Sequence, residues 1–189
     1  MKGDRLPFLL GYVEGEPWGE YISRREANRH GERLPERWVP STFLAATVER
    51  ELVGRISIRH ELNDWLAVYG GHIGYAIVPA QRRKGYATEV VRQGLVLARS
   101  VGVDDVLIIC DDDNIASATV IEHCGGELES VIDSEDGETR QRRYLDSLTS
   151  YPPNAVSTSS SCSAGLTLRK MWLILPSASI TNVVRSLPM

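Results

Sequence analysis

Apolar and polar residues alternate through the first half of the chain, and this period of two predicts β-strands. The run 42–48, TFLAATV, is β-like, and the turn ERE separates it from 52–60, LVGRISIRH, where apolar residues alternate with charged and hydroxyl residues. We expect these two runs to form a hairpin. After a loop expected at 63–71, the run 72–78, HIGYAIV, predicts a further strand that Pro79 ends.

The middle of the chain alternates between helical and extended patterns. Apolar residues of 86–101 recur at steps of three and four, which predicts a helix with one buried face, and Gly102 is a suitable stop for it. The continuous apolar run 105–110, DVLIIC, predicts a central strand. The segment 114–126 predicts a second helix, with Asn114 as a candidate cap and with Gly125 and Gly126 past its end.

Two outer segments complete the predicted order of elements. Residues 17–37 are polar with sparse apolar anchors, which predicts one or two short helices ended by Gly31 and Pro35. Residues 127–133 and 140–147 flank the turn SEDGET and predict a last hairpin. This order predicts an α+β (mixed α/β) fold, in which a mostly antiparallel sheet contains one parallel strand–helix–strand unit.

The composition is that of a globular protein, with 189 residues, 42% hydrophobic and 24% charged. A net charge of −4 argues against bulk attraction to nucleic acid, although a local basic patch is compatible with it. No run approaches the roughly 20 apolar residues of a membrane span, and the N-terminal apolar run is too short for a signal peptide. Three cysteines without a C-x-x-C pair fit a reducing cytoplasm, and four scattered histidines predict no metal site.

Acidic residues are absent from the end of the chain. All 25 lie at or before Asp146, and the stretch that follows is rich in serine and proline, which predicts disorder or a linker. Two interpretations stay open: a poorly ordered extension, or sequence added by a shifted or fused reading frame and never selected to pack. We expect the working domain to be 1–146, with 147–189 as a tail outside it.

The segment 82–87, RRKGYA, gathers three cations and a glycine where a predicted strand meets a predicted helix. The first N–H groups of a helix have no intrahelical acceptor, and the helix dipole adds partial positive charge, so such a joint can bind an anion. Gly85 lets the backbone approach a ligand without a Cβ, and the cations can contact phosphate oxygens. The residues alone fit either a phosphate-rich ligand or a solvated basic turn. The glycine signatures of P-loops and of Rossmann folds are absent.

The same six residues fit the R/Q-x-x-G-x-G/A signature of the GCN5-related N-acetyltransferases, whose backbone amides at this signature bind the pyrophosphate of acetyl-CoA. The later segment VLIICDDDNIASATVIEHCGG resembles that family's next strand, asparagine-bearing turn and helix. The resemblance covers about 39–146 and is greatest to an uncharacterised branch of predicted acetyltransferases. It implies an acyl-CoA N-acyltransferase fold, in which helices flank a central sheet and a splayed pair of strands holds the cofactor.

The resemblance also implies which residues bind acetyl-CoA. Backbone groups of Ile77 and Val78, at the end of one splayed strand, would pair with the pantetheine arm. Asn114 and Ser117 would contact this arm near its thiol end, and Asn114 can also be a plain helix cap. The residues implied to bind the pyrophosphate are Arg83, Lys84, Gly85, Tyr86, Ala87 and Thr88.

Acetylation of an amine needs a group that accepts the amine proton, and the departing thiolate benefits from a proton donor. Many family members have a tyrosine seven residues after the asparagine, and in this chain that position is Ile121. The candidate bases are His72, at the start of a strand, and Glu61, with His60 beside it. Each has a plain alternative as a solvent-facing or loop residue. Likewise, residues 111–113, three aspartates, either attract a cationic amine or form a solvated turn.

Two functions from different classes follow from the resemblance. The first is a cytoplasmic N-acetyltransferase that transfers an acetyl group from acetyl-CoA to a primary amine of a small molecule or peptide. The second, motivated by Ile121, is a non-catalytic acyl-CoA binding domain. A third reading is a damaged product whose tail impairs the fold. The first two require no metal, nucleic acid or membrane, and both are compatible with a homodimer.

Overall fold

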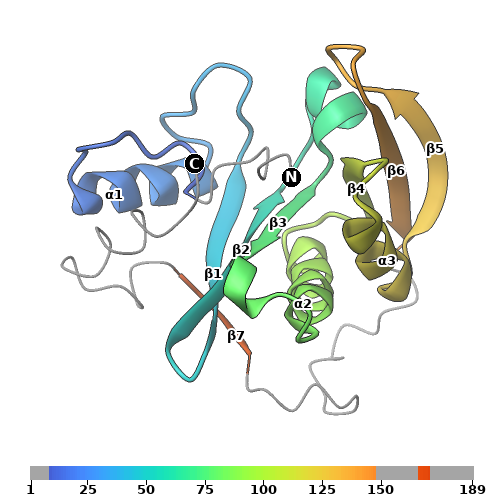
Figure 1. The fold of residues 1–189 in the computed structure, drawn as a ribbon. Helices are drawn as coiled ribbons and strands as arrows, with labels where there is room; N and C mark the ends of the chain where they lie inside the picture. Colours follow the sequence, from blue (N-terminus) through green and yellow to red (C-terminus); the bar gives the residue numbers. More distant parts are fainter. Residues whose placement is uncertain (1–8, 148–165, 171–189) are drawn as a thin grey trace.

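The computed structural model describes residues 9–147 and 166–170, which form a seven-stranded sheet with helices on both faces (Figure 1). The strand order is β5-β6-β4-β3-β2-β1-β7. The strands are β1 (Ser41–Val48), β2 (Glu51–Arg59), β3 (Ile73–Ile77), β4 (Asp105–Asp111), β5 (Glu127–Asp133), β6 (Arg140–Ser147) and β7 (Thr167–Lys170). The helices are α1 (Trp18–Arg29), α2 (Tyr86–Ser100) and α3 (Ile115–His123), with a π-helical turn at Leu66–Gly70 and a 3₁₀ turn at Pro79–Gln81.

One pairing in this sheet differs from all the others. Every neighbouring pair of strands is antiparallel except β3 and β4, which are parallel and share a single register pair, Ile73 with Ile108. Helix α2 connects these two strands, as the predicted strand–helix–strand unit requires. The predicted α+β class, with a mostly antiparallel sheet, is therefore confirmed.

The sheet carries a separate cluster of buried side chains on each face, because successive residues of a strand point to opposite faces. On β1, Leu44 and Ala46 belong to the large core that also contains residues of α2 and α3. Their neighbours Phe43 and Ala45 pack instead with Tyr21 of α1. Figure 1 shows the same division, with α1 on one side of β1 and with α2 and α3 together on the other.

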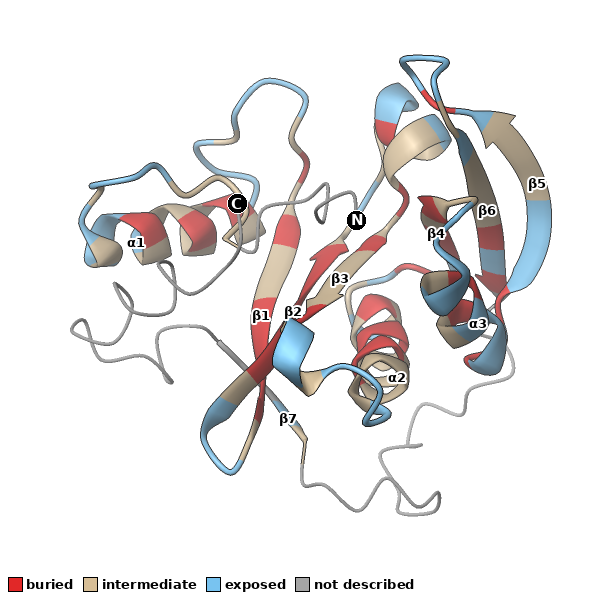
Figure 2. Ribbon diagram, viewed as in Figure 1, coloured by how far each residue is buried: buried red, intermediate tan, exposed pale blue. Residues whose placement is uncertain are grey.

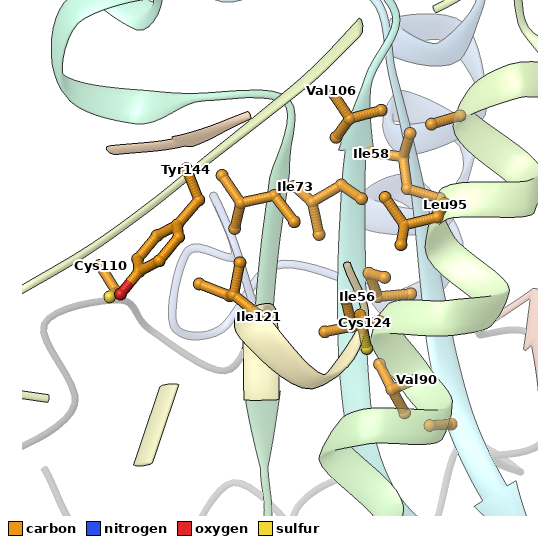
Figure 3. Close-up of a cluster of buried hydrophobic side chains, with 14 of the residues drawn as sticks. Ile56, Ile58, Ile73, Val90, Leu95, Val106, Cys110, Ile121, Cys124 and Tyr144 are labelled. Carbon is orange, nitrogen blue, oxygen red and sulfur yellow. The ribbon is translucent and has the colours of Figure 1, made fainter. Parts of the chain in front are cut away.

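The larger core joins the middle of the sheet to α2 and α3. Figure 3 shows Ile56 and Ile73 from the sheet beside Leu95 of α2 and Ile121 of α3. In Figure 2 the buried residues concentrate in the central strands and on α2, whereas β5 is largely exposed at one edge. Apolar burial of this kind is the main favourable term in folding, so this core fixes where α2 and α3 begin relative to β3 and β4.

The segment expected to be a loop at 63–71 contains helical structure, so that expectation was wrong. Leu66–Gly70 forms a π-helical turn, and the side chain of Leu66 is buried. Asn63 begins the turn, because its Oδ1 accepts a hydrogen bond from the Leu66 N–H at 2.9 Å. Five residues are too few to show a helical period in the sequence, which is why the pattern did not reveal this turn.

The tail predicted at 147–189 is described only in part. Thr167–Lys170 form β7, which pairs antiparallel with β1 at the edge of the sheet. The remainder, apart from Ser147 and Leu166, lies outside the described residues, and the division at residue 146 stays a prediction. In the described ranges, no helix is long and apolar enough to cross a lipid bilayer.

We expect Gly94→Val to destabilise the fold, because Gly94 of α2 lies directly against the side chain of Ile56 on β2. Overfilling a packed core typically costs about 1–3 kcal/mol in the free energy of unfolding. The matched control is Gly19→Val in α1, where a Cβ meets no atom within 4 Å. Urea unfolding should show a change below about 0.5 kcal/mol for this control. Equal effects of the two substitutions would contradict the close approach of α2 to β2.

Candidate active site

The chain makes a tight turn between β3 and α2, and two residues of that turn have left-handed backbone conformations. Arg83 has φ 64°, and Gly85, the residue that caps α2, has φ 80°. A glycine adopts this region without strain, so Gly85 fits its position, whereas the conformation of Arg83 is uncommon for a residue with a side chain. Turns that contain left-handed residues can direct successive N–H groups into one concavity that suits an anion.

The amide N–H groups of residues 83–88 have no hydrogen-bond acceptor within the described part of the chain. The backbone bonds of this region stop on either side of them. Arg82 N–H donates to the Pro79 carbonyl at 3.2 Å, and Glu89 N–H begins the helical ladder by donating to the Gly85 carbonyl at 3.3 Å. Six consecutive donors therefore remain available at the positive end of the α2 dipole.

Cationic side chains surround these amides. Arg82, Arg83 and Lys84 are exposed, and Lys84 Nζ donates to Gln81 Oε1 at 2.7 Å. The acidic residue in the first turn of α2, Glu89, is engaged by Arg92 at 3.3 Å and does not neutralise the joint. The joint is therefore electropositive through both its main chain and its side chains.

A gap between β3 and β4 begins next to this joint. The two strands meet only at Ile73 and Ile108, whereas β4 stays paired with β6 from Asp105 to Asp111. Beyond that one pair, the ladder between β3 and β4 does not continue in the described chain. The chain passes from the end of β3 through the 3₁₀ turn at Pro79–Gln81 into the turn at 82–85, so this turn lies near the open end of the gap (Figure 1).

The register of β3 decides which of its backbone groups face this gap. Val78 N–H donates to the Val53 carbonyl at 2.9 Å, and the Val78 carbonyl accepts from Gln81 N–H at 2.8 Å. Because hydrogen-bonded pairs alternate along an antiparallel ladder, Tyr75 and Ile77 direct their backbone groups away from β2 and towards β4. The implied role of Ile77 fits the geometry for its N–H, whereas its carbonyl also accepts a hydrogen bond from Arg82 Nε at 3.2 Å. The implied role of Val78 does not fit, because both its backbone groups are used within the chain.

The start of α3 lies across the gap from β3. Asn114 caps this helix as predicted, since its Oδ1 accepts from Ser117 N–H at 3.1 Å. Ser117 Oγ lies 2.7 Å from the hydroxyl oxygen of Tyr75, which joins α3 to β3. Burial raises the pKa of the Tyr75 phenol to about 12, so this hydroxyl keeps its proton at neutral pH.

The sequence matches the family model described as "Acetyltransferase (GNAT) domain" over residues 14–127, which is more than half of the chain. The chain belongs to the GNAT acetyltransferase family. A comparison with curated proteins found no match.

Solved structures of acetyltransferases have the same GNAT fold. The microcin C7 self-immunity acetyltransferase MccE, in complex with acetyl-CoA and AMP, is 20% identical, with a TM-score of 0.51 over 68% of each chain. Mutant forms of the spermidine/spermine N-acetyltransferase SpeG from Vibrio cholerae are 17% identical, with a TM-score of 0.50 over 72% of this chain and 81% of theirs. The aminoglycoside acetyltransferase AAC(6')-Ib with coenzyme A is 16% identical, with a TM-score of 0.47. That match covers 57% of this chain and less than two thirds, 66%, of the enzyme.

The position at which many GNAT enzymes carry a tyrosine is part of the core in this chain. Ile121 is fully buried and lies in the cluster that contains Ile73 and Tyr144 (Figure 3). Sequence reasoning had not singled out Tyr75. The available signal was its place in β3 between Ile73 and Ile77, where a residue with a polar tip occupies an apolar face.

His72, the first candidate base, is held within the sheet where β3 and β4 come together. Its ring Nδ1 accepts a hydrogen bond from the backbone N–H of Leu107 at 3.0 Å, and the backbone N–H of His72 donates to the Leu107 carbonyl at 2.7 Å. Burial and the nearby Arg59 guanidinium lower the pKa of His72 to about 4. At neutral pH the imidazole is therefore uncharged, which suits an acceptor of hydrogen bonds but makes it a weak base.

Glu61 and His60 follow the end of β2. Glu61 is exposed, and the structure does not join it to His72 by a hydrogen bond. His60 Nε2 lies 2.9 Å from Thr42 Oγ1, and burial lowers the pKa of His60. The two candidates from the sequence, His72 and Glu61, thus occupy different environments, one inside the sheet and one at the surface.

The aspartates after β4 line a polar hollow. Arg142 Nε donates a hydrogen bond to Asp112 Oδ1 at 2.6 Å. The acidic residues that line the hollow are Asp112, Asp113, Asp133 and Glu138. Within the described ranges, no three side chains of His, Cys, Asp or Glu are gathered as a metal ion would require. Whether these aspartates attract a cationic amine stays a prediction.

The environment of His72 predicts a pH dependence of stability. The folded protein keeps the pKa near 4, whereas an unfolded histidine has a pKa of about 6.5. The stabilising contribution of this group is therefore complete above pH 6.5 and is lost as the pH falls towards 4. At pH 5 the free energy of unfolding should have lost about 2 kcal/mol from this group.

His72→Asn keeps an acceptor for Leu107 N–H but removes the titrating group, so urea unfolding should show a smaller loss of stability between pH 7 and pH 5. His30→Asn, at an exposed position, should leave the loss unchanged. An unaltered pH dependence in His72→Asn would show that the fold does not hold this imidazole neutral.

Proposed function

We propose that this chain is an N-acetyltransferase that transfers the acetyl group of acetyl-CoA to a primary amine of a small molecule or peptide. One observation carries the proposal: six consecutive amide N–H groups, at residues 83–88, lack acceptors at the open end of the gap between β3 and β4. Membership of the GNAT family supports the same assignment. Cys110 and Cys124 are buried and form no disulfide, which fits the cytoplasm as the site of the reaction.

The turn before α2 and the gap between β3 and β4 would bind different parts of acetyl-CoA. The amides of 83–88, with Arg83 and Lys84, would hold the diphosphate as hydrogen-bond donors and cations. The backbone groups of Tyr75 and Ile77 would pair with the amides of the pantetheine arm, as an added strand pairs with an open sheet edge. Asn114 and Ser117, on the opposite side of the gap, would contact the arm near its sulfur.

In the reaction, the amine nitrogen bonds to the thioester carbonyl carbon, the carbon–sulfur bond breaks, and the amine loses a proton. Holding both reactants in place can supply much of the rate acceleration. For the amine proton, the candidates from the sequence are Glu61 and His72. The lowered pKa of His72 favours Glu61 as the first acceptor, either directly or through water.

The departing thiolate needs stabilisation that Ile121 cannot give. Tyr75 is suited to this role, because its hydroxyl lies beside Ser117 at the gap. Its pKa of about 12 lies above the roughly 8.5 of an ordinary thiol, so it would stabilise the thiolate by donating a hydrogen bond while keeping its proton. Solvent would then protonate the sulfur.

Gly85→Val should abolish binding of acetyl-CoA, because a branched side chain at a left-handed position would distort the amides and fill their approach to the diphosphate. Isothermal titration calorimetry should show a loss of affinity of about 100-fold or more. Gly102→Val is the matched control, since Gly102 also has a positive φ of 89° but follows the other end of α2. Unchanged affinity in Gly85→Val would remove the basis of the proposal.

Tyr75→Phe should lower kcat by about 10-fold or more while changing the affinity for acetyl-CoA less than about threefold. The measurement is release of free thiol with an amine that the unmodified protein accepts. Tyr12→Phe removes a hydroxyl on the other face of the sheet, where it bonds the Glu16 carbonyl, and should leave kcat unchanged. A full rate in Tyr75→Phe would exclude this hydroxyl from catalysis.

The second candidate function is a non-catalytic acyl-CoA binding domain, which the burial of Ile121 favours. The two functions share the binding site and differ in turnover. Tight binding of acetyl-CoA, without thiol release on any member of a broad amine panel, would support the second function and contradict the first.

A further inference from the structure

A cluster of buried cationic and hydroxyl side chains lies on the face of the sheet that α1 covers. The register of β1 and β2 places Ser41 opposite Arg59 and Phe43 opposite Ser57. Residues directly opposite each other in an antiparallel pair share a face, and the face of Phe43 is the one against which α1 packs. Helix α1 adds Arg25 to this cluster, above Ser41 and Phe43.

Arg25 has lost most of its hydration without gaining an anionic partner. It is only 7% exposed. Its Nη1 donates to Asn28 Oδ1 and its Nη2 to Ser41 Oγ, each at a long 3.4 Å, and its buried Nε has no partner. The guanidinium carbon lies 5.2 Å from the ring centroids of Trp38 and of Phe43. Burial lowers the pKa of Arg25, and no carboxylate among the described residues offsets this effect.

Other arginines of α1 are placed differently. Arg24 Nη2 lies 2.8 Å from each carboxylate oxygen of Glu16, and Arg29 pairs with Glu26 at 3.6 Å. Buried cations normally have such a partner, because attraction to aromatic rings recovers only part of the hydration that burial removes. The setting of Arg25 is therefore that of a cation whose anion arrives from outside the described chain.

A second donor without a partner lies in the same cluster. Ser57 is 2% exposed, and its buried Oγ makes no hydrogen bond. Arg55, two residues away on the same face, adds positive charge, with its guanidinium carbon 6.0 Å from the Phe43 centroid. The Arg25 guanidinium lies over the Phe43 ring and Ser57 is opposite Phe43 in the register, so both donors neighbour Phe43, and a carboxylate could satisfy them.

This cluster borders the strand that forms one side of the gap. On the same face, β3 presents Gly74 opposite Ser57 and Ala76 opposite Arg55. Arg55 Nη1 reaches the Gly74 carbonyl at 3.5 Å. Because Gly74 and Ala76 carry no bulky side chain, β3 itself contributes little obstruction between the cluster and the gap.

We propose that Arg25 and Ser57 bind the carboxylate of the acceptor, so that the acceptor is an amine that carries a carboxylate, such as an amino acid. This inference rests on the proposed acetyltransferase function and narrows its substrate class. With its carboxylate at the cluster, the acceptor would lie over Gly74 and Ala76 and direct its amine to the thioester in the gap.

The first test compares amines that differ only in the carboxylate: phenylalanine with phenethylamine, and lysine with cadaverine. For the unmodified protein we expect kcat/KM to be at least 10-fold higher for the carboxylate-bearing member of a pair. In Arg25→Met this preference should fall to near unity, mainly through KM. Arg29→Met, on the same helix, should retain it. Preference for the decarboxylated amines, or full discrimination in Arg25→Met, would overturn the proposal.

The second test does not depend on turnover. Calorimetry with N-acetylphenylalanine, which keeps the carboxylate, should show binding to the unmodified protein and to Arg29→Met, but at least 10-fold weaker binding to Arg25→Met. Ser57→Ala should weaken it by about threefold or more, and this smaller change tests the cluster even if Arg25→Met does not fold. Equal binding by the unmodified protein and Ser57→Ala would count against the cluster.

The two tests separate this inference from the proposed function. Carboxylate binding that depends on Arg25, with no acetylation of any amine, would leave the cluster standing and contradict the acetyltransferase. Acetylation at a rate that depends neither on Arg25 nor on the carboxylate of the amine would support the acetyltransferase and contradict the carboxylate site.

Discussion

The single parallel pair between β3 and β4, at Ile73 and Ile108, is the constraint on which the rest of the geometry depends. His72 joins the two strands next to this pair, because its ring Nδ1 accepts a hydrogen bond from the backbone N–H of Leu107. Beyond this pair, β4 remains fully paired with β6, while β3 continues to Ile77 without pairing with β4. At this end of the sheet, β3 is paired only with β2 and β4 only with β6, so each strand has one edge without a partner strand. Unpaired backbone groups at such an edge can pair with an added strand or an extended ligand.

The open gap also fixes where α2 begins. Ile77 ends β3, and the turn at 82–85 brings the positive end of α2 to the mouth of the gap. An unsatisfied backbone N–H removed from water costs about 1–3 kcal/mol, so six donors without acceptors in this turn are stable only because solvent or a ligand reaches them. A ligand with a diphosphate and an amide-bearing arm satisfies the joint and the strand edge together.

The two faces of the sheet carry different groups of residues near the gap. On one face, α2 and α3 bury Ile121 and place Ser117 beside Tyr75. On the other, α1 buries Arg25 over Phe43 without a carboxylate from the described chain. Cofactor and acceptor would then approach the gap from different faces, which is the arrangement that direct transfer between two bound molecules requires.

Much of this fold was predictable, because its elements are long enough to show a period. The helix predicted at 86–101 and the strand predicted at 105–110 each agree with the structure to within one residue. The anion-binding joint was predictable for a local reason, since glycine and cations at a helix start have a direct physical consequence.

What the sequence could not show depends on register and on contacts between distant residues. The assignment of Val78 to the gap failed because only the pairing of β3 with β2 reveals which backbone groups point outwards. The contact of Tyr75 with Ser117 joins residues 42 positions apart, and that of Arg25 with Ser41 joins a helix to a strand. The π-helical turn at Leu66–Gly70 was too short to leave a pattern.

The central claim is that the amides at the start of α2 hold the nucleotide end of coenzyme A. Amide chemical shifts recorded by NMR during a titration with coenzyme A test this most directly. The account predicts that the largest shifts fall on residues 83–88, with further shifts at Tyr75 and Ile77 along the gap. Saturating coenzyme A that leaves the amides of 83–88 unmoved, or that shifts only residues far from β3 and α2, would contradict it.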